Sequence, residues 1–163
     1  MGPQKHLVNT YKERFMRTWE CRDLGETEEF LRMRITRHKG IISLDQKDYL
    51  NTVLKHFNMQ NVKEASTPLP SGYNPVPNTL PVDKKLCTKY QQVIGSLLYL
   101  MLGTRPDIAY AVTKMAQFAA NPSEEHLTKA LYICKYLAGM MNYKLQYVLH
   151  LRVMFTFMDL SIG

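Results

Sequence analysis

The stretch that decides the fold is 90–139, YQQVIGSLLYLMLGTRPDIAYAVTKMAQFAANPSEEHLTKALYICKYLAG, which carries most of the concentrated apolar surface of the chain. Two helix-start signals divide it. Thr104 precedes Arg-Pro-Asp and Asn121 precedes Pro-Ser-Glu, so in each case a capping side chain is followed by an early proline and a carboxylate. Apolar residues recur at helical spacing after both signals. We therefore predict three short helices packed into a bundle.

Near the N-terminus, Leu7, Tyr11, Phe15 and Trp19 fall four residues apart. This spacing predicts an amphipathic helix with one aromatic face. Packing against another apolar surface is the ordinary role of such a face.

The segment after this helix changes to the period of a strand. Residues 31–36 alternate between apolar and polar side chains. The triplet His-Lys-Gly at 38–40 supplies a turn, and 41–44 forms the returning strand. A β-hairpin is therefore predicted. A helix through 49–57 follows, with Asp45 or Ser43 as its N-cap.

The pattern fails between the hairpin region and the bundle, where five prolines lie between positions 68 and 81. We predict an extended connector there, because proline interrupts helices. The chain then divides into 1–59 (helix, hairpin, helix), a Pro-rich linker at 60–88, the bundle at 89–140, and short strands at 141–163. The predicted fold class is α+β and mostly helical.

Composition points to a folded, basic protein. The 163 residues carry a net charge of +7 and 45% hydrophobic residues, and 12 of the 21 lysines and arginines lie in the first 64 positions. Such an excess favours a polyanionic partner, although a plain solvated surface would also account for it. The cysteines are odd in number and widely spaced, which argues against a zinc site or a disulfide framework: Cys21, Cys87 and Cys134.

No targeting or membrane signal is evident. The first residues, MGPQKHLVNTYKERF, lack the apolar core of a signal peptide, and the longest apolar run, 97–102, is far shorter than the roughly 20 residues that span a bilayer. We expect an intracellular protein, cytoplasmic or nuclear, that is not secreted and has no membrane partner.

Several ordered blocks resemble a known family. IGSLLYL at 94–100, TRPDIAYAV at 104–112, NPSEEH at 121–126 and KYLAG at 135–139 resemble the region after the polymerase active site in copia-type retrotransposon Pol polyproteins. The Asp-Leu-Gly at 23–25, followed by the hairpin, is similar to the same family. The resemblance implies the C-terminal portion of a reverse transcriptase: the end of the palm, a primer-grip-like hairpin and a thumb, truncated before ribonuclease H.

The resemblance implies that the hairpin lies against the primer's terminal phosphates. Its basic residues are candidate nucleic-acid contacts: Arg32, Arg34, Arg37 and Lys39. Family members usually have a glycine where this chain has Arg32. A glycine allows close approach of the backbone, whereas a long cation could add a phosphate contact or obstruct one.

In retroviral reverse transcriptases the first thumb helix enters the minor groove of the primer-template, with a glycine for close approach and an aromatic residue one turn later. Gly95 and Tyr99 match that spacing, and Gln92 is expected to face the same way. Alternatively, Gly95 permits close helix packing and Tyr99 is half-buried core. Both interpretations are open at this point. Lys89, Arg105 and Lys114 are further candidate phosphate contacts.

The chemistry of polymerisation is not expected in this chain. Such polymerases hold two divalent cations on clustered carboxylates, and the family signature is an aromatic-x-Asp-Asp turn, but the sequence contains no Asp-Asp pair. Asp159 lies only loosely where the family's ribonuclease H aspartate would be. We expect no catalytic residue, metal ligand or cofactor here, although the resemblance implies Mg²⁺ in the intact parent polymerase.

Other enzyme signatures are also absent from the sequence. The histidines form no H-E-x-x-H, no glycine-rich phosphate loop occurs, and Ser96 lacks the G-x-S-x-G elbow. The expected function is weak, sequence-independent binding of an RNA/DNA primer-template, with the missing fingers, palm and ribonuclease H parts as further partners. The alternative is a small helical protein-interaction module that uses Tyr132, Tyr136 and 140–143 as its surface.

Overall fold

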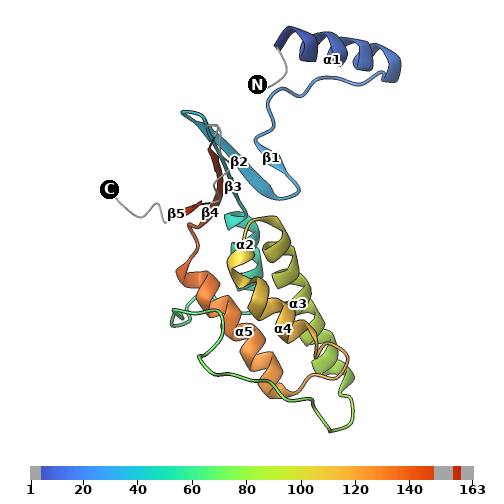
Figure 1. Ribbon diagram of the computed structural model, residues 1–163. Coiled ribbons are helices and arrows are strands. Elements are labelled where there is room, and N and C mark those ends of the chain that lie inside the picture. Colours follow the sequence, from blue (N-terminus) through green and yellow to red (C-terminus); the bar gives the residue numbers. More distant parts are fainter. Residues whose placement is uncertain (1–4, 149–155, 159–163) are drawn as a thin grey trace.

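The computed structural model describes residues 5–148 and 156–158, which form a helical body with an antiparallel sheet at one end (Figure 1). Helix α1 lies beyond the sheet, at the end of an extended segment. The elements in chain order are α1 Lys5–Trp19, β1 Glu29–Phe30, β2 Met33–His38, β3 Ile41–Asp45, α2 Lys47–His56, α3 Lys84–Gly103, the 3-10 helix η1 Pro106–Ile108, α4 Ala109–Ala116, α5 Glu124–Gly139, β4 Lys144–Val148 and β5 Thr156–Met158. The fold is mixed α+β and mostly helical, as the sequence predicts.

The predicted hairpin is present, but the strand expected over 31–36 is interrupted. Leu31 and Arg32 have φ of +50° and +57° and form a tight turn between β1 and β2. The next turn places Lys39 and Gly40 at φ +45° and +77°. Two consecutive positive φ angles are typical of the hairpin turn whose twist matches the flanking strands. Only the second turn contains a glycine that indicates a turn in the sequence. The alternation of apolar and polar residues therefore did not predict the first turn.

The sheet has the order β1-β2-β3-β4-β5, with each neighbouring pair antiparallel. β4 confirms the first of the two strands predicted in the C-terminal segment, and it joins the hairpin sheet by pairing with β3 from Ile41 opposite Val148 to Leu44 opposite Leu145. In the rest of the segment predicted to hold short strands, 141–163, the structure describes 156–158 as β5. Asp159 lies outside the described residues.

The three predicted bundle helices correspond to α3, α4 and α5, which pack on one another around a single core (Figure 1). α2 adds Leu50 and Leu54 to the same core. The hydroxyl of Tyr90 donates a buried hydrogen bond of 2.6 Å to the backbone carbonyl of Met115, which ties α3 to α4. The side chains of the core with no exposed surface include Tyr90, Val93, Leu97, Leu100, Ile108, Val112, Met115, Ala130, Ile133, Cys134 and Leu137.

The predicted helix caps at Thr104 and Asn121 are wrong. The Thr104 hydroxyl donates to the side-chain oxygen of Gln46 at 3.0 Å, and the chain continues as η1 with Pro106 in its first turn. α5 is capped by Ser123, whose hydroxyl accepts from the backbone N–H of His126 while the His126 ring accepts from the backbone N–H of Ser123. This reciprocal pair is a capping box with histidine in place of the usual Glu or Gln.

Two further helix starts differ from the prediction. α2 begins after Gln46, which makes no side-chain capping bond, and the Asp45 carboxylate accepts from the backbone N–H of Lys47 at 3.2 Å, so Asp45 caps the helix from one position before the N-cap. α3 begins at Lys84, several residues before the predicted bundle, because the Asp83 carboxylate accepts from the backbone N–H groups of the two residues after Lys84.

The Pro-rich linker runs along the bundle and is fixed to it. The side-chain amides of Asn78 and Asn121 bond each other and nearby carbonyls, among them that of Leu80, at 3.0 to 3.2 Å. Met59 and Ala65, at the start of the linker, are buried in the core. Asn121 therefore holds the linker rather than starting a helix.

The aromatic face of α1 forms as predicted, but it is exposed rather than packed. Tyr11, Phe15 and Trp19 are 69%, 60% and 68% exposed. Tyr11 and Phe15 line an apolar hollow of about 640 Å³ together with Cys21 and Leu24. This helix contributes nothing to the core of the helical body.

Candidate nucleic-acid interface

The outer face of α3 is the first part of the site. Gln92, Gly95 and Tyr99 are all exposed and follow one another at helical spacing along this face. A Cβ added to Gly95 would meet no atom within 4 Å from outside its own stretch of helix. Within the described residues, close helix packing is therefore not the reason for this glycine, and its backbone is open to an approaching ligand.

Basic side chains extend this face toward the start of α3. A shallow hollow of about 410 Å³ is lined by Lys84, Lys85, Thr88, Lys89 and Gln92. At a rise of 1.5 Å per residue, the face is about 21 Å long from Lys85 to Tyr99. That length corresponds to about six base steps of 3.4 Å.

Tyr99 joins this face to the hairpin. Its hydroxyl donates a hydrogen bond to the backbone carbonyl of Leu31 in the β1–β2 turn. Its ring meets that of Tyr49 on α2 edge to face, with centroids 4.8 Å apart. Tyr99 is nevertheless 37% exposed, so part of its ring remains available for a ligand.

Arg32 occupies the turn beside Tyr99. Its φ of +57° lies in the left-handed region, where a side chain costs about 1 kcal/mol and glycine does not. The glycine that the family resemblance leads us to expect here would therefore suit the backbone of this turn. The guanidinium carbon of Arg32 lies 5.8 Å from the centroid of the Tyr49 ring, and the side chain is exposed.

Of the other three predicted hairpin cations, Arg34 lines a hollow of about 210 Å³ together with Arg32, whereas Arg37 and Lys39 lie elsewhere. Arg34 is bonded to the Asp48 carboxylate at 2.7 Å, and this bond raises the pKa of Arg34. Arg37, three positions along the strand, points to the opposite face and donates to the carbonyl of Thr27 at 2.8 Å. Lys39 lies in the β2–β3 turn. The structure thus brings Arg32 together with Tyr99, Gly95 and Gln92 and leaves Arg37 and Lys39 apart.

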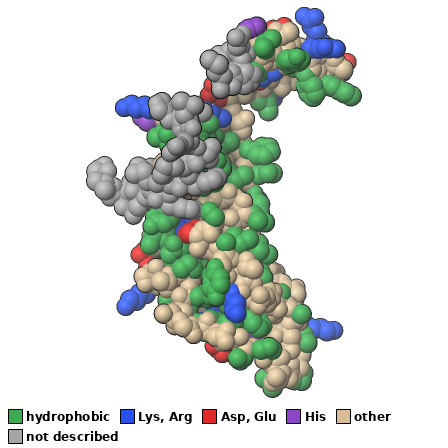
Figure 2. All heavy atoms as spheres, viewed as in Figure 1, with side chains coloured by type: hydrophobic (Ala, Val, Ile, Leu, Met, Phe, Trp, Pro, Cys, Tyr) green, Lys and Arg blue, Asp and Glu red, His purple; other side chains and the backbone are tan. Residues whose placement is uncertain are grey.

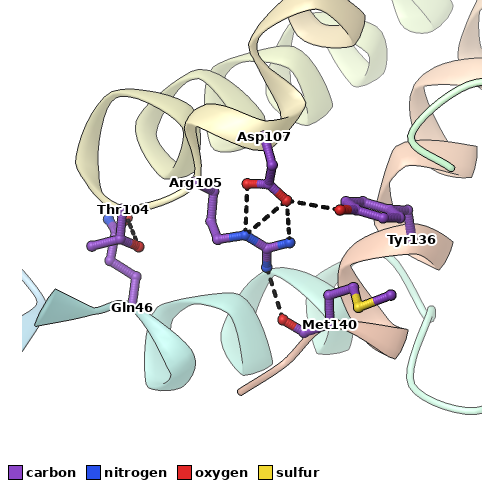
Figure 3. A network of polar contacts seen from close by, with 6 residues as sticks. All are labelled: Gln46, Thr104, Arg105, Asp107, Tyr136 and Met140. Carbon is purple, nitrogen blue, oxygen red and sulfur yellow. Dashed lines mark hydrogen bonds and ion pairs between the residues drawn. The ribbon is translucent and has the colours of Figure 1, made fainter. Parts of the chain in front are cut away.

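A buried polar network beneath this surface was missed by sequence reasoning (Figure 3). Arg105 is 3% exposed and makes a forked ion pair with Asp107, with contacts of 2.7 to 3.3 Å. Its remaining arm donates to the carbonyl of Met140 at the end of α5, at 3.0 Å. Arg105 is therefore a structural residue, and its prediction as a phosphate contact is wrong.

Tyr136 completes the network from α5. Its hydroxyl donates to the Asp107 carboxylate at 3.0 Å, and burial, with the Asp107 charge in second place, raises the pKa of Tyr136 to about 12. Because Tyr136 is buried, the surface proposed for a protein-interaction module, which included it, is not exposed as predicted. The Arg-Pro-Asp triplet was the only sequence signal for this network, and it also fits an ordinary helix start.

A second link lies next to this network, where Gln46 at the start of α2 bonds Thr104 (Figure 3). A Cβ added to Gly103 would lie 2.3 Å from the Gln46 side-chain oxygen, so the backbone of α3 and this side chain are in close contact. At the residue before Gln46, the buried Asp45 carboxylate lies 3.7 Å from the Lys144 ammonium group of β4. These contacts fix the sheet end relative to α3, and with it the position of Arg32 relative to Gly95.

Among residues 5–148 and 156–158, no three His, Cys, Asp or Glu side chains lie close enough to share a metal ion. Within the same ranges, no helix is long and apolar enough to cross a membrane.

Comparison with known proteins shows what the chain is similar to. Residues 1–71 match the family model described as "Reverse transcriptase (RNA-dependent DNA polymerase)". The Pol polyprotein of transposon TNT 1-94 from Nicotiana tabacum is 35% identical over 85% of this chain and 11% of its own length. That of transposon RE1 from Arabidopsis thaliana is 34% identical over 87% of this chain and 10% of its own length. The chain is a relative of copia-type retrotransposon Pol polyproteins.

The resemblance inferred from the sequence blocks is thus confirmed for a chain that spans about a tenth of the length of these two Pol polyproteins. An uncharacterized mitochondrial protein of Arabidopsis thaliana is also similar, at 30% identity over 85% of this chain and 56% of its own length. No solved structure matches the chain.

Proposed function

We propose that this relative of the Pol polyproteins is the primer-template-binding part of a reverse transcriptase, without the catalytic centre. The observation that carries the proposal is the exposed face of α3, where Gly95 has no neighbour within 4 Å and Tyr99 is bonded to the hairpin turn. An RNA/DNA hybrid laid along this face would meet lysines at one end and Arg32 at the other.

Each residue of this face has a distinct role in the proposal. Gly95 lets the backbone approach the minor groove, Tyr99 contacts sugar one turn away, and Gln92 offers a hydrogen-bonding amide. Lys85 and Lys89 neutralise phosphates. Because phosphate and groove shape are the same for every sequence, the binding is sequence-independent, weak and sensitive to salt.

The polymerisation chemistry is assigned to other parts of the polyprotein. A two-cation mechanism needs converging carboxylates, and the described residues contain no such cluster. In this proposal the fingers and the palm hold the Mg²⁺ ions of the intact polymerase, and they and the ribonuclease H part are partners of this chain. The exposed aromatic face of α1 supports a contact of this kind, since such a face is normally covered.

The test is a titration of the full chain with a fluorescent RNA/DNA hybrid at several salt concentrations. The expected result is an affinity that falls steeply with salt, and a salt dependence that is weaker by about one unit of slope for each of Lys85→Ala and Lys89→Ala. Lys129→Ala on α5 is the matched control. It removes the same charge but a different contact, with the Tyr73 ring, and should leave the slope unchanged. An affinity that does not depend on salt would contradict the proposal.

The second candidate, a protein-interaction module, is favoured by α1 rather than by the surface predicted from sequence. Two results together would favour the protein-interaction module over nucleic-acid binding. The RNA/DNA hybrid would not bind at low salt, and the double substitution Phe15→Ser and Trp19→Ser would change the hydrodynamic size of the chain. Hybrid binding that these two substitutions leave intact favours the nucleic-acid binder.

A further inference from the structure

A hollow of about 290 Å³ lies where the β1–β2 turn, α2 and α3 meet, and its lining is Leu31, Arg32, Tyr49 and Tyr99. Two tyrosine rings and a leucine make most of this lining apolar, with a single cation beside them. Figure 2 shows hydrophobic side chains at the surface along the edge where β1 and the end of α3 lie. The exposed side chains near this hollow include Phe30 and Leu31.

The shape of the hollow is held by contacts between the three elements. The hydrogen bond from Tyr99 to the Leu31 carbonyl fixes the turn against α3. The edge-to-face contact between Tyr49 and Tyr99, with rings inclined at 66°, leaves the ring faces pointing in different directions. A planar ligand can therefore stack on one ring and meet the edge of the other.

We propose that this hollow binds one unpaired nucleobase at the end of the hybrid. The inference rests on the proposed function, because Tyr99 belongs to both the duplex-binding face and the hollow. A paired base is held in the duplex by its partner strand, whereas an unpaired base at the end can turn out of the helix and place its face on a tyrosine ring. Since stacking uses the face and not the edge of the base, all four bases are accepted.

The charges around the hollow agree with a nucleotide as the occupant. Arg32 supplies a cation for the nucleotide's phosphate or a guanidinium plane for its base. A second hollow of about 210 Å³ shares Arg32 and Tyr49 with this one, and its acidic and basic side chains balance: Glu29, Asp45 and Asp48 against Arg32, Arg34 and Lys47.

The test compares a blunt RNA/DNA hybrid with the same hybrid carrying one unpaired fluorescent purine at its end. The expected result is that the overhang raises the affinity about tenfold, the size of one stacking contact, and that the purine's fluorescence changes on binding. Tyr49→Leu should bring the ratio of the two affinities close to one, and Tyr49→Phe should keep it. Lys89→Ala should weaken both hybrids by a similar factor and preserve the ratio.

Arg32→Gln is the second variant, since it changes an exposed turn and leaves the core intact. It should lower the overhang ratio without affecting the melting temperature of the chain. Equal affinities for the two hybrids, or a ratio that Tyr49→Leu and Arg32→Gln leave unchanged, would overturn the base site and leave the duplex-binding proposal standing. If neither hybrid binds at low salt, both proposals are overturned.

Discussion

Helices α1 and α3 both carry apolar side chains at helical spacing, yet the two stripes have opposite environments. Leu97 of α3 is 0% exposed inside the core, whereas Trp19 of α1 is 68% exposed. Apolar spacing therefore determines a helix and its apolar face, but not what covers that face. In α3 the cover comes from α4 and α5 of the same chain. Substitutions can test this contrast between the helical body, in which α3, α4 and α5 cover one another, and the exposed helix α1.

The largest effect is expected at the buried ion pair of the body. Arg105→Met leaves the Asp107 carboxylate without its cation and the Met140 carbonyl without its donor. We expect the free energy of unfolding to fall by about 3 to 5 kcal/mol, measured by urea denaturation. The matched control is Arg34→Met, which breaks an exposed pair and should cost no more than about 1 kcal/mol. Equal losses of unfolding free energy for the two variants would show that the buried Arg105–Asp107 ion pair does not stabilise the body more than an exposed pair.

Truncation of the two apolar stripes compares the helices directly. Leu97→Ala should lower the free energy of unfolding by about 3 kcal/mol, because it leaves a cavity in a closed core. Trp19→Ala should change it by less than about 0.5 kcal/mol, because the side chain is already exposed. A loss of similar size at both positions in urea melts would mean that α1 is packed in solution.

Alanine substitutions at two glycines of α3 should change stability by smaller amounts and in opposite directions. Gly95→Ala should stabilise the chain by about 0.5 to 1 kcal/mol, since alanine favours the helix and the new Cβ meets nothing. The same substitution should weaken binding to the RNA/DNA hybrid. Gly103→Ala should destabilise by about 1 to 3 kcal/mol, because its Cβ would collide with Gln46. If Gly95→Ala left hybrid affinity unchanged, close approach at this glycine would be ruled out.

The smallest effect concerns pH and the linker. His126 is buried, stacks on Phe118, accepts from the Ser123 N–H and is also hydrogen-bonded to the backbone of Val76 in the linker. Burial lowers its pKa, and the Val76 bond and the charge of Glu125 only partly oppose this.

Below its ordinary pKa of about 6.5 the unfolded chain binds a proton at His126 that the folded chain does not bind. Stability should therefore fall as the pH drops through about 6.5, and level off below the folded pKa. His126→Gln keeps an acceptor at this position of the capping box and should remove this part of the pH dependence, measured by thermal melts. His38→Gln, at an exposed hairpin residue, should retain it.

The sequence could predict much of the fold because the bundle helices and the second hairpin turn are announced by local patterns. The errors occur where a side chain that could cap a helix locally bonds instead to a residue far away in the sequence. Thr104 could cap a helix, but it bonds Gln46, which is 58 positions away. Asn121 bonds Asn78 across 43 positions. Leu31 and Arg32 form a turn without any turn residue, so no local pattern announces it.

The candidate site shows the same limit. The spacing of Gln92, Gly95 and Tyr99 was enough to place them on one face of a helix, but not to decide whether that face is exposed. The contact of Tyr99 with Leu31 joins positions 68 residues apart, and only the packed structure reveals it. The buried Arg105 looked like any surface cation until Asp107 and Met140 were placed around it.

Amide hydrogen exchange, with and without a saturating RNA/DNA hybrid at low salt, tests the central claim most directly. Without ligand, α3 and α5 should exchange slowly and α1 close to the rate of an unfolded chain. The hybrid should slow exchange along 85–99 and in the 31–32 turn and leave α1 unchanged. Slowing confined to α1, or none along α3, would contradict the assignment of nucleic-acid binding to this face of the body.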